Sequence, residues 1–115
     1  MYRSGGIFAL MLRAAAEGVQ KRGKAKLGDK TVLDALFPAV EAAERAIVSG
    51  QGLSQCVDEA LAAARQGAED TVNMRSQAGR ASCFGDRTIG VKDPGAAALV
   101  IMLDSIAKSV KMIIV

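Results

Sequence analysis

Histidine and tryptophan are absent from this 115-residue sequence, and cysteine and proline each occur only twice. Without histidine, the chain cannot build a histidine-ligated metal site or use imidazole as a general acid or base. Two cysteines are too few to indicate a disulfide framework or a zinc site. These absences exclude several frequent kinds of catalytic and metal-binding site.

Aromatic residues are also scarce, with one tyrosine and three phenylalanines, although half of the residues are hydrophobic. Alanine, leucine, isoleucine and valine dominate that apolar half. Apolar segments rich in alanine favour helices that approach one another closely. The length is that of one domain, and the apolar content is enough for a real core.

Neither charge sign dominates, because 15 lysines and arginines are scattered among 12 aspartates and glutamates, for a net charge of +3. This pattern shows no basic face of the kind that binds nucleic acid. Arg13 interrupts the N-terminal apolar run and no cleavage site follows, so we expect no signal peptide. The charge-free run from Pro94 to Leu103 is only about half of a bilayer span. We therefore expect a cytoplasmic protein without a membrane or nucleic-acid partner.

Helical spacing of apolar residues recurs in four segments, and no strand-like alternation is found. The four expected helices begin at Ile7, at the capping signal Asp29–Thr31, at Leu53 and at Gly95. They end between Gly18 and Gly23, near Ser49–Gly52, near Arg75 and near Met112. Four helices joined up and down are typical of a bundle, so the predicted fold class is all-α, an antiparallel helical bundle.

Each of the four segments carries an apolar stripe. The stripes of the second and third segments are Leu33, Leu36, Phe37, Val40, Ala43 and Ile47, and Leu53, Cys56, Val57, Ala60, Leu61, Ala64, Ala68 and Thr71. Those of the first and last segments are Ile7, Leu10, Met11, Ala14 and Ala15, and Leu99, Met102, Leu103, Ile106 and Val110. The last segment is apolar on most sides, but charged residues interrupt it, so we expect a core helix.

The segment from Gly79 to Ala96 is the one long stretch without a clear helical period. Loops of this length inside a small domain are usually functional or disordered. It ends in Asp93-Pro94-Gly95, where Asp93 is a natural N-cap and Pro94 suits the first helical position. Such a helix start can hold an anion through its free N–H groups. On residue spacing alone, the alternative to an anion-binding helix start is an ordinary capped helix with a proline turn.

Two segments of the sequence resemble motifs of one known protein family. Residues 23–36, GKAKLGDKTVLDAL, resemble the GDKTMLDAL signature of the nucleotide-binding (L) domain of dihydroxyacetone kinases. Residues 79–96, GRASCFGDRTIGVKDPGA, resemble the GRASYLGERSIGHQDPGA segment of the same domain. The order and separation of the motifs also match, so the resemblance covers roughly residues 8–107. The departures are Val32 for methionine, Cys83-Phe84 for Tyr-Leu and Val91-Lys92 for His-Gln.

The resemblance implies that residues 1–115 are part of an L domain, which is a barrel of about eight antiparallel helices with a nucleotide at one end. Such a domain phosphorylates dihydroxyacetone held by a separate domain or subunit, and its cofactors are ADP or ATP with magnesium. Some members use ATP directly, and others keep a bound ADP that a phosphotransferase-system protein rephosphorylates. The expected partners are a dihydroxyacetone-binding kinase domain or subunit and, in the second case, that phosphoryl donor.

The same resemblance supplies the candidate nucleotide-binding residues: Gly23, Val32, Arg80, Asp93, Pro94 and Gly95. In family terms, Val32 would line the adenine pocket, and Arg80 and the turn ending at Gly95 would lie beside the nucleotide. Phosphoryl transfer depends on positioning and charge neutralisation, and an arginine offers phosphate a fixed fork of donors. The alternative is that Arg80 pairs with Asp86 or Asp93 and only holds the loop.

Two elements of the family's site have no counterpart in this sequence. They are the GDGDHG loop, whose three aspartates hold magnesium, and a later Gly-Ala-Ser loop. The aspartates of this chain are not clustered like the missing loop. We therefore assign no catalytic residue and no metal ligand, and we expect no kinase turnover from this chain alone.

The sequence leaves two main functions open. The first is the nucleotide-binding portion of a dihydroxyacetone (glycerone) kinase, and the second is a non-catalytic helical protein-interaction domain that retains the kinase fold. A related fatty-acid-kinase-type domain is a further enzyme alternative. Half of a closed helical barrel should expose apolar faces, so we also expect self-association or a companion segment.

Overall fold

A computed structural model describes residues 4–23, 28–74 and 90–114 of the chain. These ranges contain four α-helices and one short 3-10 helix: α1 (Ser4–Gly23), α2 (Leu33–Val48), α3 (Leu53–Asp70), η1 (Thr71–Asn73) and α4 (Pro94–Ile114). They contain no strand. The predicted all-α class is confirmed, with the helices near the four segments that the apolar spacing marked.

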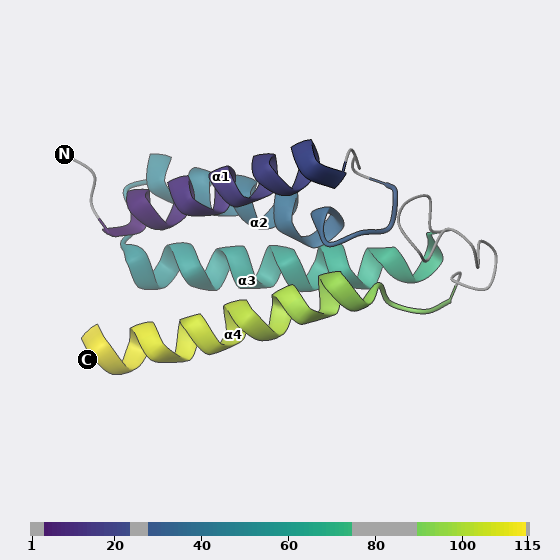
Figure 1. Cartoon of the computed structure of the whole chain (residues 1–115). Helices are drawn as coiled ribbons and strands as arrows, with labels where there is room; N and C mark the ends of the chain where they lie inside the picture. The colour runs from purple at the N-terminus through teal and green to yellow at the C-terminus, as the bar shows by residue number, and fades with distance from the viewer. Residues whose placement is uncertain (1–3, 24–27, 75–89, 115) are drawn as a thin grey trace.

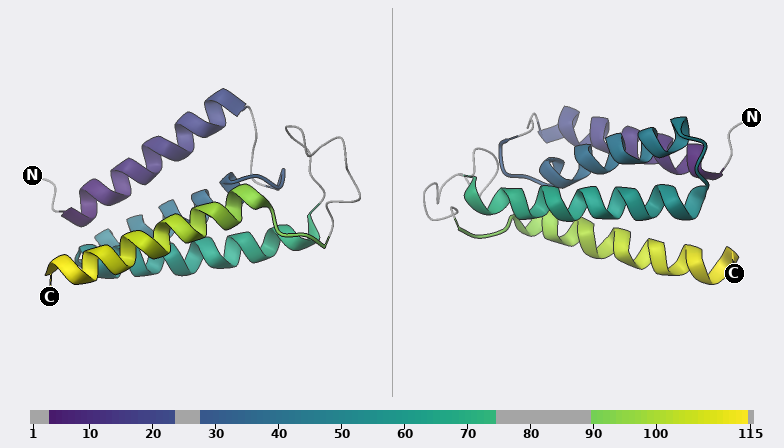
Figure 2. Two further views of the ribbon diagram at one scale, coloured as in Figure 1. Left: turned by 60° about the horizontal axis from the view of Figure 1, so that its bottom comes forward. Right: turned by 180° about the vertical axis from the view of Figure 1, so that it is seen from behind.

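The helices run alternately up and down (Figure 1). α1 and α3 end at the same end of the bundle, where α2 and α4 begin. We call this the loop end, made up of Gly23 and residues 28–32, 71–74 and 90–95. At the other end, α1 begins, α4 ends and Ser49–Gly52 joins α2 to α3. We call it the turn end, and two further views show the same arrangement (Figure 2).

The two inner helices, α2 and α3, form the most tightly packed part of the molecule. Their contact is close because small residues line it, and a Cβ added at Gly67 of α3 would lie only 2.1 Å from the backbone oxygen of Asp34. The apolar stripes expected for these helices are buried or partly buried. Buried members are Leu33, Leu36, Val40, Ala43, Cys56, Val57, Ala60, Leu61, Ala64 and Ala68.

The outer helices, α1 and α4, each pack one face on the inner pair. α1 buries Ala9 and Ala16 there, whereas the stripe that its spacing marked lies mostly on the outward face. The exposed fractions in that stripe are 48% for Ile7, 54% for Leu10 and 65% for Met11. The periodic signal was correct for a helix, but α1 is apolar on two faces. Its inward face carries small buried residues together with the partly buried Phe8 and Leu12.

α4 shows the same division between a buried and an exposed apolar face. Leu103 is buried on the inner helices, whereas Ile101 and Met102 are 68% and 59% exposed. Ion pairs of Asp104 with Arg65 at 3.1 Å and of Lys111 with Asp58 at 3.3 Å hold α4 against α3. α4 is therefore a core helix on one side only. None of the helices in the described ranges is long and apolar enough to cross a membrane.

Candidate functional site

The start of α2 is built around the carboxylate of Asp34, which is 3% exposed. One oxygen accepts a hydrogen bond from the Gly28 N–H at 2.6 Å, and the other accepts one from the Thr31 N–H at 2.9 Å. The Thr31 hydroxyl oxygen accepts a bond from the Leu33 N–H at 3.1 Å. This reciprocal pattern resembles a capping box with Thr31, one of the two residues of the capping signal that could cap α2. Asp34 thereby fixes the turn that carries Val32.

Lys30 fastens this turn to the end of α3. Its backbone lies in the left-handed region, with φ 61°, and the residue is only 4% exposed. Its ammonium group donates a hydrogen bond to the Met74 backbone oxygen at 3.1 Å. Sequence reasoning missed this residue because a lysine in a polar turn is normally solvated. Only its place inside the first family motif could have drawn attention to it.

The start of α4 is fastened to the same end of α3. Asp93 accepts a hydrogen bond from the Ala96 N–H through its carboxylate at 2.9 Å, and from the Ala97 N–H through its backbone oxygen at 3.0 Å. Its own N–H donates to the hydroxyl of Thr71 at 2.9 Å. The predicted roles of Asp93 as N-cap and Pro94 as first helical residue are confirmed. A carboxylate of the chain thus already occupies the position at which this helix start could hold an anion.

The two turns meet beside Gly95. A Cβ added at Gly95 would lie 3.4 Å from the Cβ of Val32 and 3.1 Å from the Asp93 carboxylate. The structure thus brings Val32, Asp93, Pro94 and Gly95 together, although 61 residues separate Val32 from Asp93. Gly23 ends α1 at the same end of the bundle (Figure 1). Arg80, the remaining candidate, lies outside the described residues.

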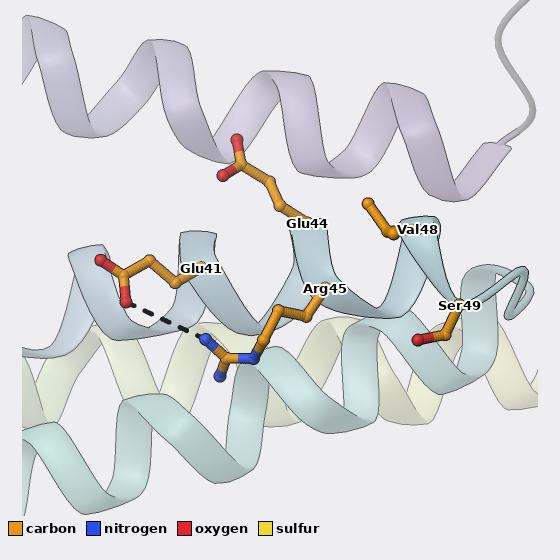
Figure 3. A pocket seen from close by; sticks show the side chains of 5 residues that line it. All are labelled: Glu41, Glu44, Arg45, Val48 and Ser49. Atoms are coloured by element: carbon orange, nitrogen blue, oxygen red, sulfur yellow. Dashed lines mark ion pairs between the residues drawn. The ribbon is translucent and has the colours of Figure 1, made fainter.

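Among the surface hollows lined by described residues, two lie along the helices, and neither brings together the candidate residues. The first, of about 460 Å³, is lined by described residues of α2 and of the turn that follows: Glu41, Glu44, Arg45, Val48 and Ser49 (Figure 3). Glu41 and Arg45 form an ion pair of 4.0 Å there. Glu44 instead binds Arg13 of α1 at 2.7 Å, and this hydrogen bond lowers the pKa of the Glu44 carboxyl.

The second hollow, of about 500 Å³, lies between α3 and α4 and reaches Lys92, next to Asp93. Its lining residues are Arg65, Ala68, Glu69, Lys92, Ala97, Val100 and Ile101. The two cations are already paired, Lys92 with Glu69 at 2.6 Å and Arg65 with Asp104 at 3.1 Å. Across the described ranges, no group of three or more acidic or cysteine side chains is placed to hold a metal ion.

Comparison with known proteins identifies similar chains. A model of the family described as "DAK2 domain" matches residues 4–108. The ADP-binding subunit DhaL of the PEP-dependent dihydroxyacetone kinase of Escherichia coli is 37% identical over 101 residues, which are 88% of this chain and 48% of that subunit. The corresponding subunit of kinase 2 of Listeria innocua is 34% identical, over 88% of this chain and 46% of its own length.

A larger protein is also similar. Human triokinase/FMN cyclase is 39% identical over 93 residues, which are 81% of this chain and 16% of that protein. The chain therefore spans about half the length of the two DhaL subunits and a small part of the longer kinase.

Proposed function

The chain belongs to the DAK2 domain family, and we propose that residues 1–115 form the nucleotide-binding portion of a dihydroxyacetone kinase. The observation that carries this proposal is the meeting of Val32 with the Asp93-Pro94-Gly95 turn at the loop end. These residues come from the two motifs that resemble the L domain. The printed names of the DhaL relatives, which describe ADP-binding subunits, support the same assignment.

We assign ADP or ATP to the loop end. Val32 is partly buried and apolar, so it suits one wall of an adenine pocket. Arg80 offers a fork of N–H donors for phosphate, and Gly23 and Gly95 leave room for a ligand to approach the backbone. Because the Asp93 carboxylate already caps α4, a phosphate would bind beside that carboxylate rather than in its place.

The transferred phosphoryl group would pass to dihydroxyacetone held by a separate kinase domain or subunit. The donor is ATP directly, or an ADP that a phosphotransferase-system protein recharges; the "PEP-dependent" names of the DhaL relatives favour the second route. We propose that this reaction takes place in the cytoplasm.

Magnesium does not fit the two buried acidic residues of this end, Asp34 and Asp93. Both oxygens of Asp34 and one oxygen of Asp93 accept hydrogen bonds from the chain's own N–H groups. Both carboxylates are therefore already used to hold the turns at the starts of α2 and α4. We expect no kinase turnover from the 115 residues alone, even with the dihydroxyacetone-binding partner present.

One observation favours a second candidate function, that of a helical interaction domain without catalysis. The outward faces of α1 and α4 expose large apolar side chains, as expected for a half-barrel, and exposed apolar patches mark partner surfaces. These side chains are Ile7, Leu10, Met11, Ile101, Met102, Ile106, Met112 and Ile113. We therefore propose that the chain self-associates or is covered by a companion segment.

Calorimetric titration with ADP tests the nucleotide proposal. If Arg80 binds phosphate as proposed, Arg80→Ala would remove a charge-assisted contact worth roughly 1.5–3 kcal/mol, so ADP affinity should fall about tenfold to a hundredfold. Gly95→Val should also weaken binding, because its side chain would crowd Val32 and Asp93. Gly18→Val is the matched control, since a Cβ at Gly18 meets nothing within 4 Å.

Two outcomes would count against this assignment. Unchanged ADP affinity in both variants, with helical content intact, would mean that the segment from Gly79 to Ala96 has only a structural role and that the nucleotide site lies elsewhere. If the wild-type chain binds no ADP but associates with itself or a partner, the interaction-domain alternative holds instead.

A further inference from the structure

We propose that Thr71 is a positioning residue for the nucleotide site, an inference that rests on the nucleotide-binding function proposed above. Thr71 caps the C-terminus of α3 as the first residue of η1, is fully buried and lies 22 residues before Asp93. Its hydroxyl makes two hydrogen bonds: it donates to the Ala68 backbone oxygen at 2.6 Å and accepts from the Asp93 N–H at 2.9 Å. A single side-chain oxygen therefore joins the end of α3 to the start of α4.

The bond to Ala68 alone would be ordinary. Threonine hydroxyls at helix ends often bond to a carbonyl three or four residues earlier in the same helix. The bond accepted from Asp93 differs, because its partner is the buried residue that caps another helix, α4. A buried N–H without an acceptor is costly, so Thr71 stabilises the turn that begins at Asp93 by supplying that acceptor.

The position of Asp93 sets the position of Gly95. The carboxylate of Asp93 binds the Ala96 N–H at 2.9 Å, so the intervening Pro94 and Gly95 form one short, fixed turn. Gly95 is in turn the residue that faces Val32. The proposed site has two halves, the turn at 28–32 that carries Val32 and the turn at 90–95 that carries Gly95. If the Asp93 N–H lost its acceptor, Gly95 would be held less firmly at its distance from Val32.

The same short segment holds the other half of the site as well. Met74, three residues after Thr71, accepts the hydrogen bond from the ammonium group of Lys30. The Gly90 N–H donates to the backbone oxygen of Val72, between them. Both halves of the proposed site, the turn at 28–32 and the turn at 90–95, are therefore attached to residues 71–74. Thr71 makes its attachment through its side chain, whereas Val72 and Met74 make theirs through backbone oxygens.

Titration of ADP into Thr71→Ser, Thr71→Ala and Thr71→Val tests this role. Serine and alanine both lack the methyl group and differ from each other only in the hydroxyl, and valine keeps the shape of threonine. Since an unmade buried hydrogen bond is costly, we expect about tenfold weaker ADP binding for the alanine and valine variants. The serine variant should bind within about twofold of wild type, because it keeps the acceptor.

A matched control separates positioning from stability. Val57→Ala creates a small cavity at a fully buried position of the same helix, near its other end. We expect this variant to melt at a lower temperature but to bind ADP with wild-type affinity. Far-ultraviolet circular dichroism at the titration temperature verifies that each variant is folded, and the serine–alanine pair decides the question if valine does not fold.

The outcomes distinguish the two proposals. Absence of ADP binding by the wild-type chain would overturn the proposed function, and this inference with it. Wild-type binding with equal affinities for the serine and alanine variants would overturn the positioning role alone. An affinity loss in Val57→Ala as large as in Thr71→Ala would likewise show that Thr71 acts only through overall stability.

Discussion

The two ends of the bundle are held together by different means. At the turn end, the link from α2 to α3 is closed mainly by backbone bonds, in which the N–H groups of Ser49, Gly50 and Gln51 donate to oxygens of the last turn of α2. The side-chain bond there from the buried Cys56 thiol to the Gln51 backbone oxygen, at 3.7 Å, is weak and local. At the loop end, buried side chains of Asp34 and Thr71 bind backbone N–H groups of the turns. A four-residue turn needs only local bonds. An end that unites segments distant in the chain needs polar side chains inside the protein.

Buried polar groups are stable only when each has a partner, and they are costly otherwise. Within the described residues, every buried side-chain nitrogen and oxygen has one. Networks of this kind fix a unique local geometry, which is what a binding site requires. The buried polar side chains of the loop end therefore agree with the placement of the proposed site there. Substitutions at matched positions of the two ends can test the difference between them.

The largest effect is expected at Gly67, where α2 and α3 touch near the loop end. In Gly67→Val, the new Cβ would overlap the Asp34 backbone oxygen, so the inner helices must move apart. Overpacking of a tight contact costs about 1–3 kcal/mol or more, and we expect at least about 3 kcal/mol here. Urea denaturation monitors the loss. Gly52→Ala at the turn end, where a Cβ meets nothing within 4 Å, should change stability by less than about 1 kcal/mol.

The next effect concerns the buried carboxylate of the loop end. Asp34→Ala leaves the N–H groups of Gly28 and Thr31 without their acceptor, and we expect a loss of about 2–3 kcal/mol in the free energy of unfolding. Ser49→Ala removes an exposed hydroxyl at the turn end and should stay within about 0.5 kcal/mol of wild type. Equal losses in the two variants, measured by thermal denaturation, would contradict the difference between the ends.

A smaller effect is expected from the backbone of the turn end. Gly50 has φ 82° just after the C-terminus of α2, a conformation that glycine adopts without penalty. Gly50→Ala should lower the free energy of unfolding by about 1 kcal/mol. ADP affinity should not change, since Gly50 lies at the opposite end from the proposed site. A parallel fall in affinity would remove the functional distinction between the ends.

The smallest effect belongs to a contact away from both ends, the ion pair of Arg13 with Glu44. The hydrogen bond from Arg13 lowers the pKa of Glu44, so its stabilisation is complete above the ordinary value near 4.5 and is lost as pH falls through the lowered pKa. Both side chains are about two-fifths exposed, at 35% and 42%, so we expect less than about 1 kcal/mol. Glu44→Gln should remove this part of the pH dependence below 4.5 in denaturation curves.

Sequence analysis predicted the elements that local chemistry controls. The four helices follow from long, strongly periodic segments, and the capping role of Asp93 follows from the residues beside it. It also found the buried stripes of α2 and α3. It did not show that Ile7, Leu10 and Met11 face outward, because periodicity marks a stripe equally whether the same chain or a partner covers it.

The sequence also could not identify the contacts that build the loop end. Thr71 was assigned to an apolar stripe, and nothing near it in sequence shows that Asp93 supplies the partner of its hydroxyl. Lys30 was read as part of a motif without a structural role. Both residues act through backbone groups distant in the chain, and single-sequence patterns carry no signal for such pairs.

The placement of the nucleotide is tested most directly by the amide spectrum of the ¹⁵N-labelled chain during titration with ADP. Our account predicts progressive shifts for the amides of Gly28, Val32 and Gly95 at the loop end, with those of Gly50 and Gly52 at the turn end unchanged. Shifts confined to the turn end, or no shift at millimolar ADP, would contradict it.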